Sequence, residues 1–293
     1  MTDNLARVQS ANYSLAPSLP LPASTEAPTA TVYAPINRVG DAKPGSREVV
    51  HVVDDLDLED FTAVAAHYGQ NRYGYVVTPN VDHFIRCHED PSFRSLYRNA
   101  DYVLMDSRFF ARVLRLLTGV RLRVCTGSDL SETLLSRVVS PADRIVMVGG
   151  SEQQAKDLAA IYGLTQVAHH NPPMGFIKDP VAVEECLQFI EQASPFRFCF
   201  LAFGSPQQEV IANMLLARGK ARGLALCVGA SLNFVTGVEK RAPVWLQRLS
   251  LEWLHRLMQN PRRMAGRYLV RGPRIFKYLR RARFVLRKAP ANA

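Results

Sequence analysis

Residues 144–162 read RIVMVGGSEQQAKDLAAIY, and this stretch indicates the fold class. The apolar, β-branched run Arg144–Val148 predicts a buried strand. The turn Gly149-Gly150-Ser151 follows, and Gln153–Tyr162 has the amphipathic pattern of a helix. A strand that passes through a tight turn into a helix is the repeating unit of an α/β fold.

The same unit recurs along residues 47–242. The predicted strands are Val49–Val53, Tyr75–Val77, Tyr102–Met105, Arg144–Val148, Phe198–Phe203 and Ala225–Val228. The predicted helices between them are Leu58–Tyr68, Ser107–Leu117, Gly127–Val138, Gln153–Tyr162, Val181–Gln192 and Gln207–Arg218. Because alternating strands and helices connect by right-handed crossovers, we expect a mainly parallel sheet with helices on both faces.

The two ends of the chain differ from this central part. Residues 1–46 are rich in Ala, Pro, Ser and Thr without apolar periodicity, which predicts a mobile arm. The chain of 293 residues carries a net charge of +10, but Lys240–Lys288 contains fifteen Lys and Arg residues and a single acid, Glu252. We therefore expect a nearly neutral body with a basic C-terminal segment, residues 243–293, whose partner is polyanionic.

Apolar residues in the basic segment recur at three- and four-residue steps, as on one face of a helix. They are Trp245, Leu246, Leu249, Trp253, Leu254 and Leu257. A basic helix with aromatic residues suits an anionic membrane surface. Two alternatives stay open: a helix packed on the body with a solvated charged face, and a nucleic-acid-binding arm, although the known nucleic-acid-binding motifs are absent. We expect the strands of the body all to precede Pro243, so truncation before Pro243 should change the stability of the body less than it changes membrane binding and activity.

Cysteine usage and hydropathy favour a reduced, cytoplasmic compartment. The five cysteines are scattered and form no CxxC pair, which disfavours a disulfide framework and a structural zinc site. No window offers ~18 consecutive apolar residues, so we expect no transmembrane helix. The N-terminal residues also lack the pattern of a signal peptide.

Small or polar residues follow several predicted strands. These turns are Thr78-Pro79-Asn80, Asp106-Ser107, Gly149-Gly150-Ser151, Gly204-Ser205-Pro206 and Gly229-Ala230-Ser231. Open α/β sheets bind ligands outside the carboxyl ends of their strands, so these turns are the expected site. Each motif can equally be a helix cap or a turn that has no further function.

Four positions in these turns, and Gln208 just after one of them, offer specific chemistry. A carboxylate such as Asp106 at an apolar strand end can have a raised pKa and act as a general base, or it can cap the next helix. Thr78 and Asn80 can hydrogen-bond a sugar or a reacting hydroxyl. Gly150 would let an anion approach a helix N-terminus. Gln208, at the mouth of a helix, can bind hydroxyls or phosphates.

Several other chemistries are disfavoured. Neither a P-loop nor a G-x-G-x-x-G motif occurs, which disfavours a kinase and an NAD enzyme. His169 and His170 are adjacent, point in different directions, and have no acidic partner at a recognised spacing. We therefore expect neither a metal nor a cofactor.

Taken together, these motifs resemble those of the WecG/TagA/CpsF family of bacterial glycosyltransferases. The resemblance extends from about Glu48 to Arg280. It is carried by the stretches Thr78–Asp82, Ala100–Asp106, Thr126–Leu130, Gly204–Glu209, Val228–Phe234 and Lys240–Arg263. In one departure, the chain has Met105-Asp106-Ser107 where the family often has Pro-Asp-Gly.

The resemblance implies a fold and an activity. The fold is Rossmann-like, with a C-terminal appendage that docks on the membrane and completes the site. The activity is the inverting, metal-independent transfer of a hexose or N-acetylhexosamine-type sugar from a UDP-sugar to a polyprenyl-diphosphate-linked sugar, in exopolysaccharide or cell-surface polysaccharide assembly. The identity of the sugar, the acceptor, the linkage and the oligomeric state, a homo-oligomer included, stay open.

The resemblance also implies roles for single residues. The family's proposed catalytic Asp falls on Asp106. A site Arg of the family falls on Val124, and we assign its role to the neighbouring Arg123. The expected substrate-binding residues are Thr78, Asn80, Arg123, Gly150, Gln208, Arg256 and Arg263. The expected membrane-binding residues are Arg262, Arg267, Arg271 and Arg274.

We thus expect a mobile arm (1–46), a Rossmann-like glycosyltransferase domain (47–242) and a basic helical, membrane-associating appendage (243–293). The protein would lie at the cytoplasmic face of the cell membrane. The rival hypothesis is a non-enzymatic nucleotide-binding module with a nucleic-acid-binding tail. It predicts a salt-sensitive complex with RNA or DNA and no turnover of a UDP-sugar. We favour the enzyme, without a nucleic-acid partner.

Overall fold

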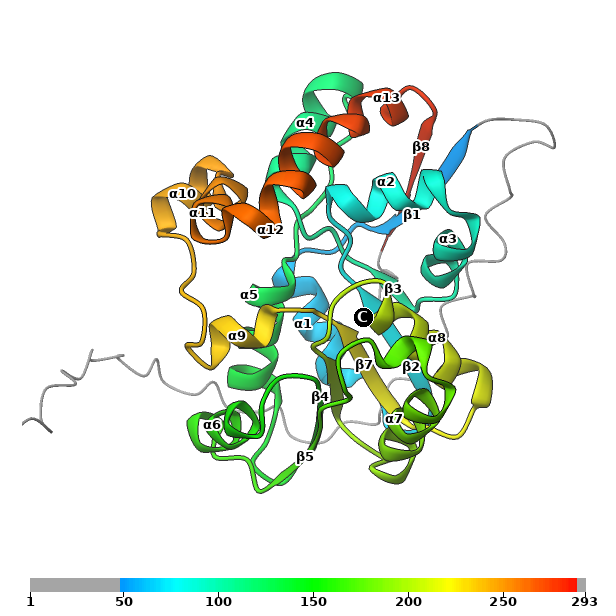
Figure 1. The fold of residues 1–293 in the computed structure, drawn as a ribbon, viewed down its shortest axis with the longest axis vertical. Coiled ribbons are helices and arrows are strands. Elements are labelled where there is room, and N and C mark those ends of the chain that lie inside the picture. The colour runs from blue at the N-terminus through cyan, green and yellow to red at the C-terminus, as the bar shows by residue number, and fades with distance from the viewer. Residues whose placement is uncertain (1–47, 289–293) are drawn as a thin grey trace, which may run out of the picture. The chain divides into compact units, whose positions relative to one another are not determined.

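The body is built on a six-stranded parallel sheet. The computed structural model describes residues 48–288; the expected arm, 1–46, and residues 289–293 lie outside the described part. The strand order is β3-β2-β7-β6-β4-β5, and every pairing is parallel (Figure 1). The strands are β2 (Tyr73–Val77), β3 (Tyr102–Val103), β4 (Arg144–Val148), β5 (Gln166–His170), β6 (Phe198–Leu201) and β7 (Gly223–Cys227).

Helices cover both faces of this sheet, which confirms the predicted fold class. One face packs against α3 (Pro91–Arg98), the 3₁₀ turn η3 (Phe176–Lys178), α7 (Pro180–Gln192) and α8 (Gln207–Arg218). The other packs against α1 (Leu58–His67), α5 (Gly127–Thr133), the π-helical turn η2 (Leu134–Val138), α6 (Glu152–Tyr162) and α9 (Ser231–Val235). The pleat of β2 shows the cause, since Tyr75 and Val77 enter the first core and Val76 enters the second.

One strand of this sheet was not predicted from the sequence. β5 lies at the edge of the sheet, and its residues are exposed or half-buried. It contains His169 and His170, and it lacks the apolar run that identifies the central strands. Its pairing with β4 supplies the stability that its own composition does not.

The C-terminal segment is helical as far as Leu279. It contains α10 (Val244–Leu249), α11 (Glu252–Gln259), α12 (Pro261–Ala265), the π-helical turn η4 (Gly266–Arg271), the 3₁₀ turn η5 (Gly272–Arg274) and α13 (Ile275–Leu279). The single apolar helix face expected from Trp245 to Leu257 is wrong. Ser250 has a φ of 62°, which ends α10 and turns the chain into α11.

The same segment then ends in a strand. β8 (Ala282–Arg287) pairs in parallel with β1 (Val49–Asp54), forming a separate two-stranded sheet (Figure 1). A third hydrophobic core joins this sheet to α2 (Val81–Glu89), α4 (Arg108–Thr118) and α13. The expectation that every strand precedes Pro243 is therefore wrong. Its corollary, that truncation before Pro243 changes the stability of the body less than its membrane binding, loses its basis.

A buried ion pair fixes the end of β8. Arg287 donates to both carboxylate oxygens of Asp54, which is 1% exposed, and to the carbonyl of Asp101. Asp54 also accepts from the backbone N–H of Val103 at 2.7 Å. Removing one member of a buried pair leaves the other charge without compensation. Asp54 and Arg287 therefore depend on each other for the closure of β8 on β1.

We expect Arg287→Ala to lower the free energy of unfolding by about 3–5 kcal/mol, because it leaves the Asp54 carboxylate buried and unpaired. Arg283→Ala is the matched control, since Arg283 lies in the same strand and is exposed. We expect the control to cost less than about 0.5 kcal/mol. Urea unfolding measures both, and equal losses would contradict a specific role of the ion pair.

Candidate active site

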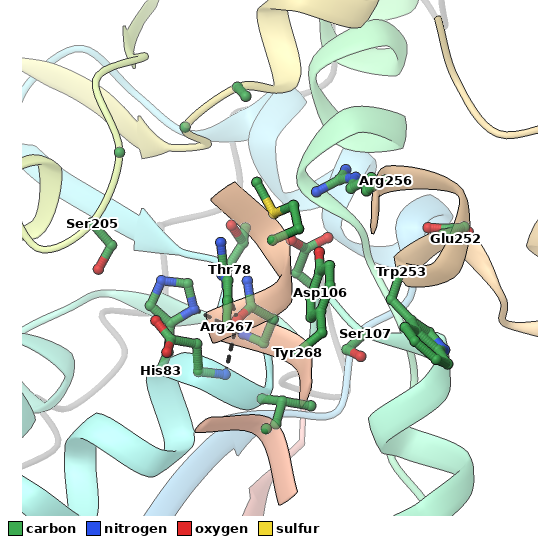
Figure 2. A pocket seen from close by; sticks show the side chains of 18 of the residues that line it. Thr78, His83, Asp106, Ser107, Ser205, Glu252, Trp253, Arg256, Arg267 and Tyr268 are labelled. Atoms are coloured by element: carbon green, nitrogen blue, oxygen red, sulfur yellow. Dashed lines mark hydrogen bonds between the residues drawn. The ribbon is translucent and has the colours of Figure 1, made fainter. Parts of the chain in front are cut away.

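A cavity of about 570 Å³ lies at the carboxyl ends of β2, β3, β6 and β7 (Figure 2). Turns that follow these strands form one wall, and α11, α12, η4 and η5 form the opposite wall, which we call the roof. The cavity is lined by six of the residues singled out from the sequence. They are Thr78, Asn80, Asp106, Gln208, Arg256 and Arg267. The C-terminal segment thus completes a pocket that begins at the sheet.

Asp106 follows β3 and is half-buried in the wall of the cavity. Its Oδ1 accepts from the backbone N–H of Gly127 at 3.0 Å. Gly127 is closely surrounded, since a Cβ there would lie 3.0 Å from the Ser231 hydroxyl and 3.4 Å from that of Thr78. Burial raises the pKa of Asp106 to about 7, although the charge of Arg256 and the Gly127 N–H oppose the shift.

The alternative role of Asp106 as a helix cap is wrong. Ser107 is the N-cap of α4, because its side chain accepts from the backbone N–H of Phe110 at 3.1 Å. The Asp106 carboxylate is therefore left for the cavity. A carboxylate with a pKa near 7 can accept a proton at neutral pH.

The roof helix α11 brings a cation to this carboxylate. The guanidinium of Arg256 lies 5.1 Å from the ring centroid of Phe234 and reaches toward Asp106 (Figure 2). Glu252 lies one turn earlier on the same helix and bonds to Arg108 at 2.5 Å. Arg256 and Glu252 both line the cavity, and the Arg256 charge acts on Asp106.

An ion-pair chain that sequence reasoning missed ties α11 to the body. Arg108 donates to both Glu252 and Asp129, and Arg241 donates to the other oxygen of Asp129. Burial acts to raise the pKa of Asp129, but hydrogen bonds from Arg241 and Thr126 hold it below its usual value. The sequence offered one signal for the ion pair between α11 and the body, because Glu252 is the single acid of the basic segment.

Thr78 and Asn80 lie at the end of β2. The Thr78 hydroxyl donates to the Cys227 carbonyl at 3.0 Å, which ties β2 to β7. Asn80 caps α2 by accepting from the Asp82 N–H at 3.1 Å, and its Oδ1 also accepts from Arg267 of the roof at 3.0 Å. Capping and cavity lining are therefore combined in Asn80 rather than being alternatives.

Gln208 braces two of the strand-end turns. Its Oε1 accepts from the Gly229 N–H at 2.9 Å, and its Nε2 donates to Glu209 at 3.0 Å. Burial raises the pKa of Glu209. Burial, aided by the charge of Arg267, lowers the pKa of the nearby His83 to about 3, so His83 is neutral at pH 7.

Comparison with known proteins shows to which family the chain belongs. The family model "Glycosyl transferase WecG/TagA/CpsF family" matches residues 49–289. The chain belongs to this glycosyltransferase family. One curated relative is an N-acetylglucosaminyldiphosphoundecaprenol N-acetyl-beta-D-mannosaminyltransferase from Bacillus spizizenii. It is 26% identical over 229 residues, which cover 72% of this chain and 84% of the relative. The resemblance inferred from the motifs is confirmed.

Two residues assigned to substrate binding lie away from the cavity of this glycosyltransferase. Arg123 forms ion pairs with Asp57 and Asp60 at the start of α1 and is absent from the cavity lining. Gly150 also does not line it. Gly150 has a φ of 74°, and a Cβ there would lie 2.6 Å from the Met147 side chain, so the turn into α6 explains this glycine.

The arginines of the roof are divided between two environments. Arg267 bonds to Asn80, while Arg271 and Arg274 pair with acids of α2 at 3.2 and 3.3 Å. These three arginines, expected at the membrane, thus tie the roof to the body. Arg262 is exposed. Arg263 lies in α12, and its side chain is outside the described part of the structure.

Two searches of residues 48–288 were negative. No group of three or more His, Cys, Asp and Glu side chains is placed to hold a metal ion in that range. None of the helices described there is long and apolar enough to cross a membrane.

We expect Asp106→Asn to raise the free energy of unfolding at pH 8 by roughly 1–3 kcal/mol. The native state holds the Asp106 proton up to a pKa of about 7, and the unfolded state only to about 3.8. The wild-type protein therefore loses stability as the pH rises from about 4 to about 7, and the Asn variant avoids that loss. Urea unfolding at pH 5 and 8 measures the difference.

The control for this prediction is Glu185→Gln, which removes an exposed acid on α7. Its effect on stability should be small and equal at both pH values. A gain in Asp106→Asn that did not grow between pH 5 and pH 8 would contradict the raised pKa.

Proposed function

We propose that this protein is an inverting, metal-independent glycosyltransferase that moves a sugar from a UDP-sugar to a polyprenyl-diphosphate-linked sugar. The observation that carries the proposal is Asp106, whose pKa is raised to about 7 in a cavity roofed by arginines. Family membership supports glycosyl transfer. The name of the curated relative supports an acceptor of the N-acetylglucosaminyl-diphosphoundecaprenol type and an N-acetylmannosaminyl donor.

The mechanism requires one in-line displacement. The hydroxyl oxygen of the acceptor attacks the anomeric carbon of the donor, and the bond from that carbon to the UDP oxygen breaks with its electron pair. The Asp106 carboxylate takes the hydroxyl proton as the new bond forms. Asp106 then returns the proton to solvent. A single displacement inverts the anomeric configuration.

The leaving diphosphate requires positive charge at the moment when the bond breaks. Arg256 reaches into the cavity next to Asp106, and Arg267 lines the same cavity from η4. Fixed guanidinium groups in a partly dry site stabilise developing phosphate charge strongly. The appendage would thus supply the electrostatic part of catalysis, and the sheet would supply the base.

A lipid-linked acceptor would place the enzyme at the cytoplasmic face of the cell membrane. The basic segment supports this location, since Lys and Arg are attracted to anionic lipids. The role would be in exopolysaccharide or cell-surface polysaccharide assembly. The rival nucleotide-binding module does not account for a carboxylate with a pKa near 7 in the wall of the cavity, so we set it aside.

We expect Asp106→Asn to lower turnover by about 10²–10⁴-fold, because the amide cannot accept the proton. The wild-type kcat/KM should rise with pH and reach half its maximum near pH 7, since the ionised carboxylate is the active form. Release of UDP from a panel of UDP-sugars, with a lipid-diphosphate-sugar acceptor, measures both. UDP-sugar binding should persist in the variant, and wild-type turnover there would exclude Asp106 as the base.

We expect Arg256→Ala to lower kcat by about 10²–10³-fold, because it removes charge that stabilises the leaving diphosphate. The matched control is Arg280→Ala, an exposed arginine that follows α13 in the same segment. The control should keep turnover within about twofold of wild type.

The proposal also requires that arginines, not a metal ion, neutralise the diphosphate. Turnover should therefore continue in excess EDTA. Complete loss of turnover in EDTA, with recovery on adding Mg²⁺ or Mn²⁺, would show that a metal ion neutralises the diphosphate and would contradict the proposal.

A further inference from the structure

Large exposed apolar side chains are concentrated on one part of the molecule. Of the fourteen found among residues 48–288, ten lie on α4 or in the C-terminal segment. Those in the segment are Val244, Trp245, Leu249, Met258, Leu269, Val270 and Phe276. Those on α4 are Phe109, Leu116 and Leu117. The α4 group belongs to the body, outside the appendage to which the sequence assigns membrane binding.

The end of α4 is the most exposed apolar site of this group. Leu116 is 83% exposed and Leu117 is 58% exposed. The opposite side of the helix is buried, since Phe110 and Leu114 pack in the core that also contains Ile275 of α13. The exposed leucines therefore contribute nothing to that core. Solvent exposure of two adjacent leucines at a helix end is unfavourable unless a partner covers them.

The outer side of α4 is continuous with the exposed apolar side chains of α10 and α11. Arg112 donates to the carbonyls of Arg248 and Leu249 at 2.6 and 3.1 Å. The rings of Phe109 and Trp253 lie 5.9 Å apart. The first half of α4 thus adjoins the appendage, and Leu116 lies one turn beyond Arg112 on the same side of the helix.

The positive charge around Leu116 and Leu117 indicates which kind of partner covers them. Residues 108–123 contain five arginines and no acid. Arg108 pairs with Asp129 of the body and Glu252 of α11, and Arg123 pairs with Asp57 and Asp60. Arg115 and Arg121 are exposed and form no ion pair with any residue in the range 48–288. Exposed leucines flanked by unpaired arginines complement an anionic lipid surface, which takes the apolar groups and the charges together.

α4 also connects the exposed leucines with the cavity, because the two lie at opposite ends of the helix. Arg108 and Phe109, at the start of α4, line the cavity. Leu116 and Leu117 follow Phe109 by seven and eight residues, and an α-helix rises about 1.5 Å per residue, so they lie roughly 11–12 Å from the cavity lining along α4. A lipid-linked acceptor held in the membrane would have a distance of this order to cross.

We propose that the end of α4, Arg115–Leu117 with Arg121, is a second membrane-contacting element that inserts into an anionic bilayer beside α10. The inference rests on the proposed function only for the reason why a membrane contact should flank the cavity. Arg267, Arg271 and Arg274 are held by the body, so the contact depends on α4 more than the sequence suggests.

The first test compares two double variants in vesicle sedimentation. Leu116→Ser/Leu117→Ser should bind equimolar phosphatidylglycerol–phosphatidylcholine vesicles about tenfold or more weakly than wild type. Ile161→Ser/Val181→Ser is the matched control, because Ile161 on α6 and Val181 on α7 are 55% and 66% exposed. The control should bind like wild type. Equal binding by all three proteins, or equal losses in both variants, would overturn the proposal.

A second measurement does not depend on removing the leucines. All five native cysteines are buried, so Leu116→Cys provides a single exposed thiol for a polarity-sensitive fluorophore. Its emission should shift to the blue when the same vesicles are added, and emission from labelled Ile161→Cys should not. An unchanged emission at position 116 with the protein bound to vesicles would overturn the proposal.

The charge is tested separately. Arg115→Gln/Arg121→Gln should weaken binding to the anionic vesicles by about tenfold or more, and added salt should shrink the difference. Lys178→Gln/Lys220→Gln, which removes two exposed lysines, should change it less than about twofold. An equal effect of the two pairs would exclude local recognition by α4.

Turnover separates this inference from the proposed function. With a short, water-soluble acceptor, the Leu116→Ser/Leu117→Ser variant should release UDP at the wild-type rate. If the wild-type protein released no UDP, the proposed glycosyltransferase function would be contradicted, but the vesicle-binding measurements would still test the membrane contact of α4. Loss of a dimer in this variant with vesicle binding intact would assign the surface to a second copy of the chain and overturn the membrane role.

Discussion

The parallel pairing of β8 with β1 is the constraint on which the site depends. These strands are more than 220 residues apart in the chain, and the buried Asp54–Arg287 pair fixes their register at one end. Because β8 follows α13 directly, this pairing sets where the roof can lie. Closing so long a loop costs conformational entropy, which the third core around α2, α4 and α13 offsets.

Residues that cap helices in this protein also form the cavity or lie next to residues that do. Asn80 ends β2, caps α2 and accepts from a roof arginine. Ser107 caps α4 and so leaves the neighbouring Asp106 for the cavity. Treating capping and function as competing interpretations of a strand-end motif is therefore mistaken here. The capping bonds hold these backbone segments rigidly, which is what a catalytic geometry requires.

The sequence predicts the elements whose side-chain pattern is locally complete. The central strands are apolar runs followed by small residues, and Asp106 stands out because its carboxylate follows such a run. β5 and β8 could not be found in this way, since their pairing is decided by long-range packing of half-buried residues. The chain Arg241–Asp129–Arg108–Glu252 was hidden for the same reason, because a charge shows its partner only after folding. The assignment of a family arginine to Arg123 could not anticipate that Arg123 pairs with Asp57 and Asp60 at the start of α1.

The raised pKa of Asp106 links the roof to the chemistry. Burial is its largest cause, and the roof forms one wall of the cavity in which Asp106 lies. If the roof lifted, water would reach the carboxylate and its pKa would fall toward the ordinary value, making it a weaker base. The same movement would withdraw Arg256, so base strength and leaving-group stabilisation would be lost together. In the proposed mechanism, a closed roof is therefore the state in which proton abstraction and leaving-group stabilisation occur together, and the contacts that close the roof matter as much as the base does.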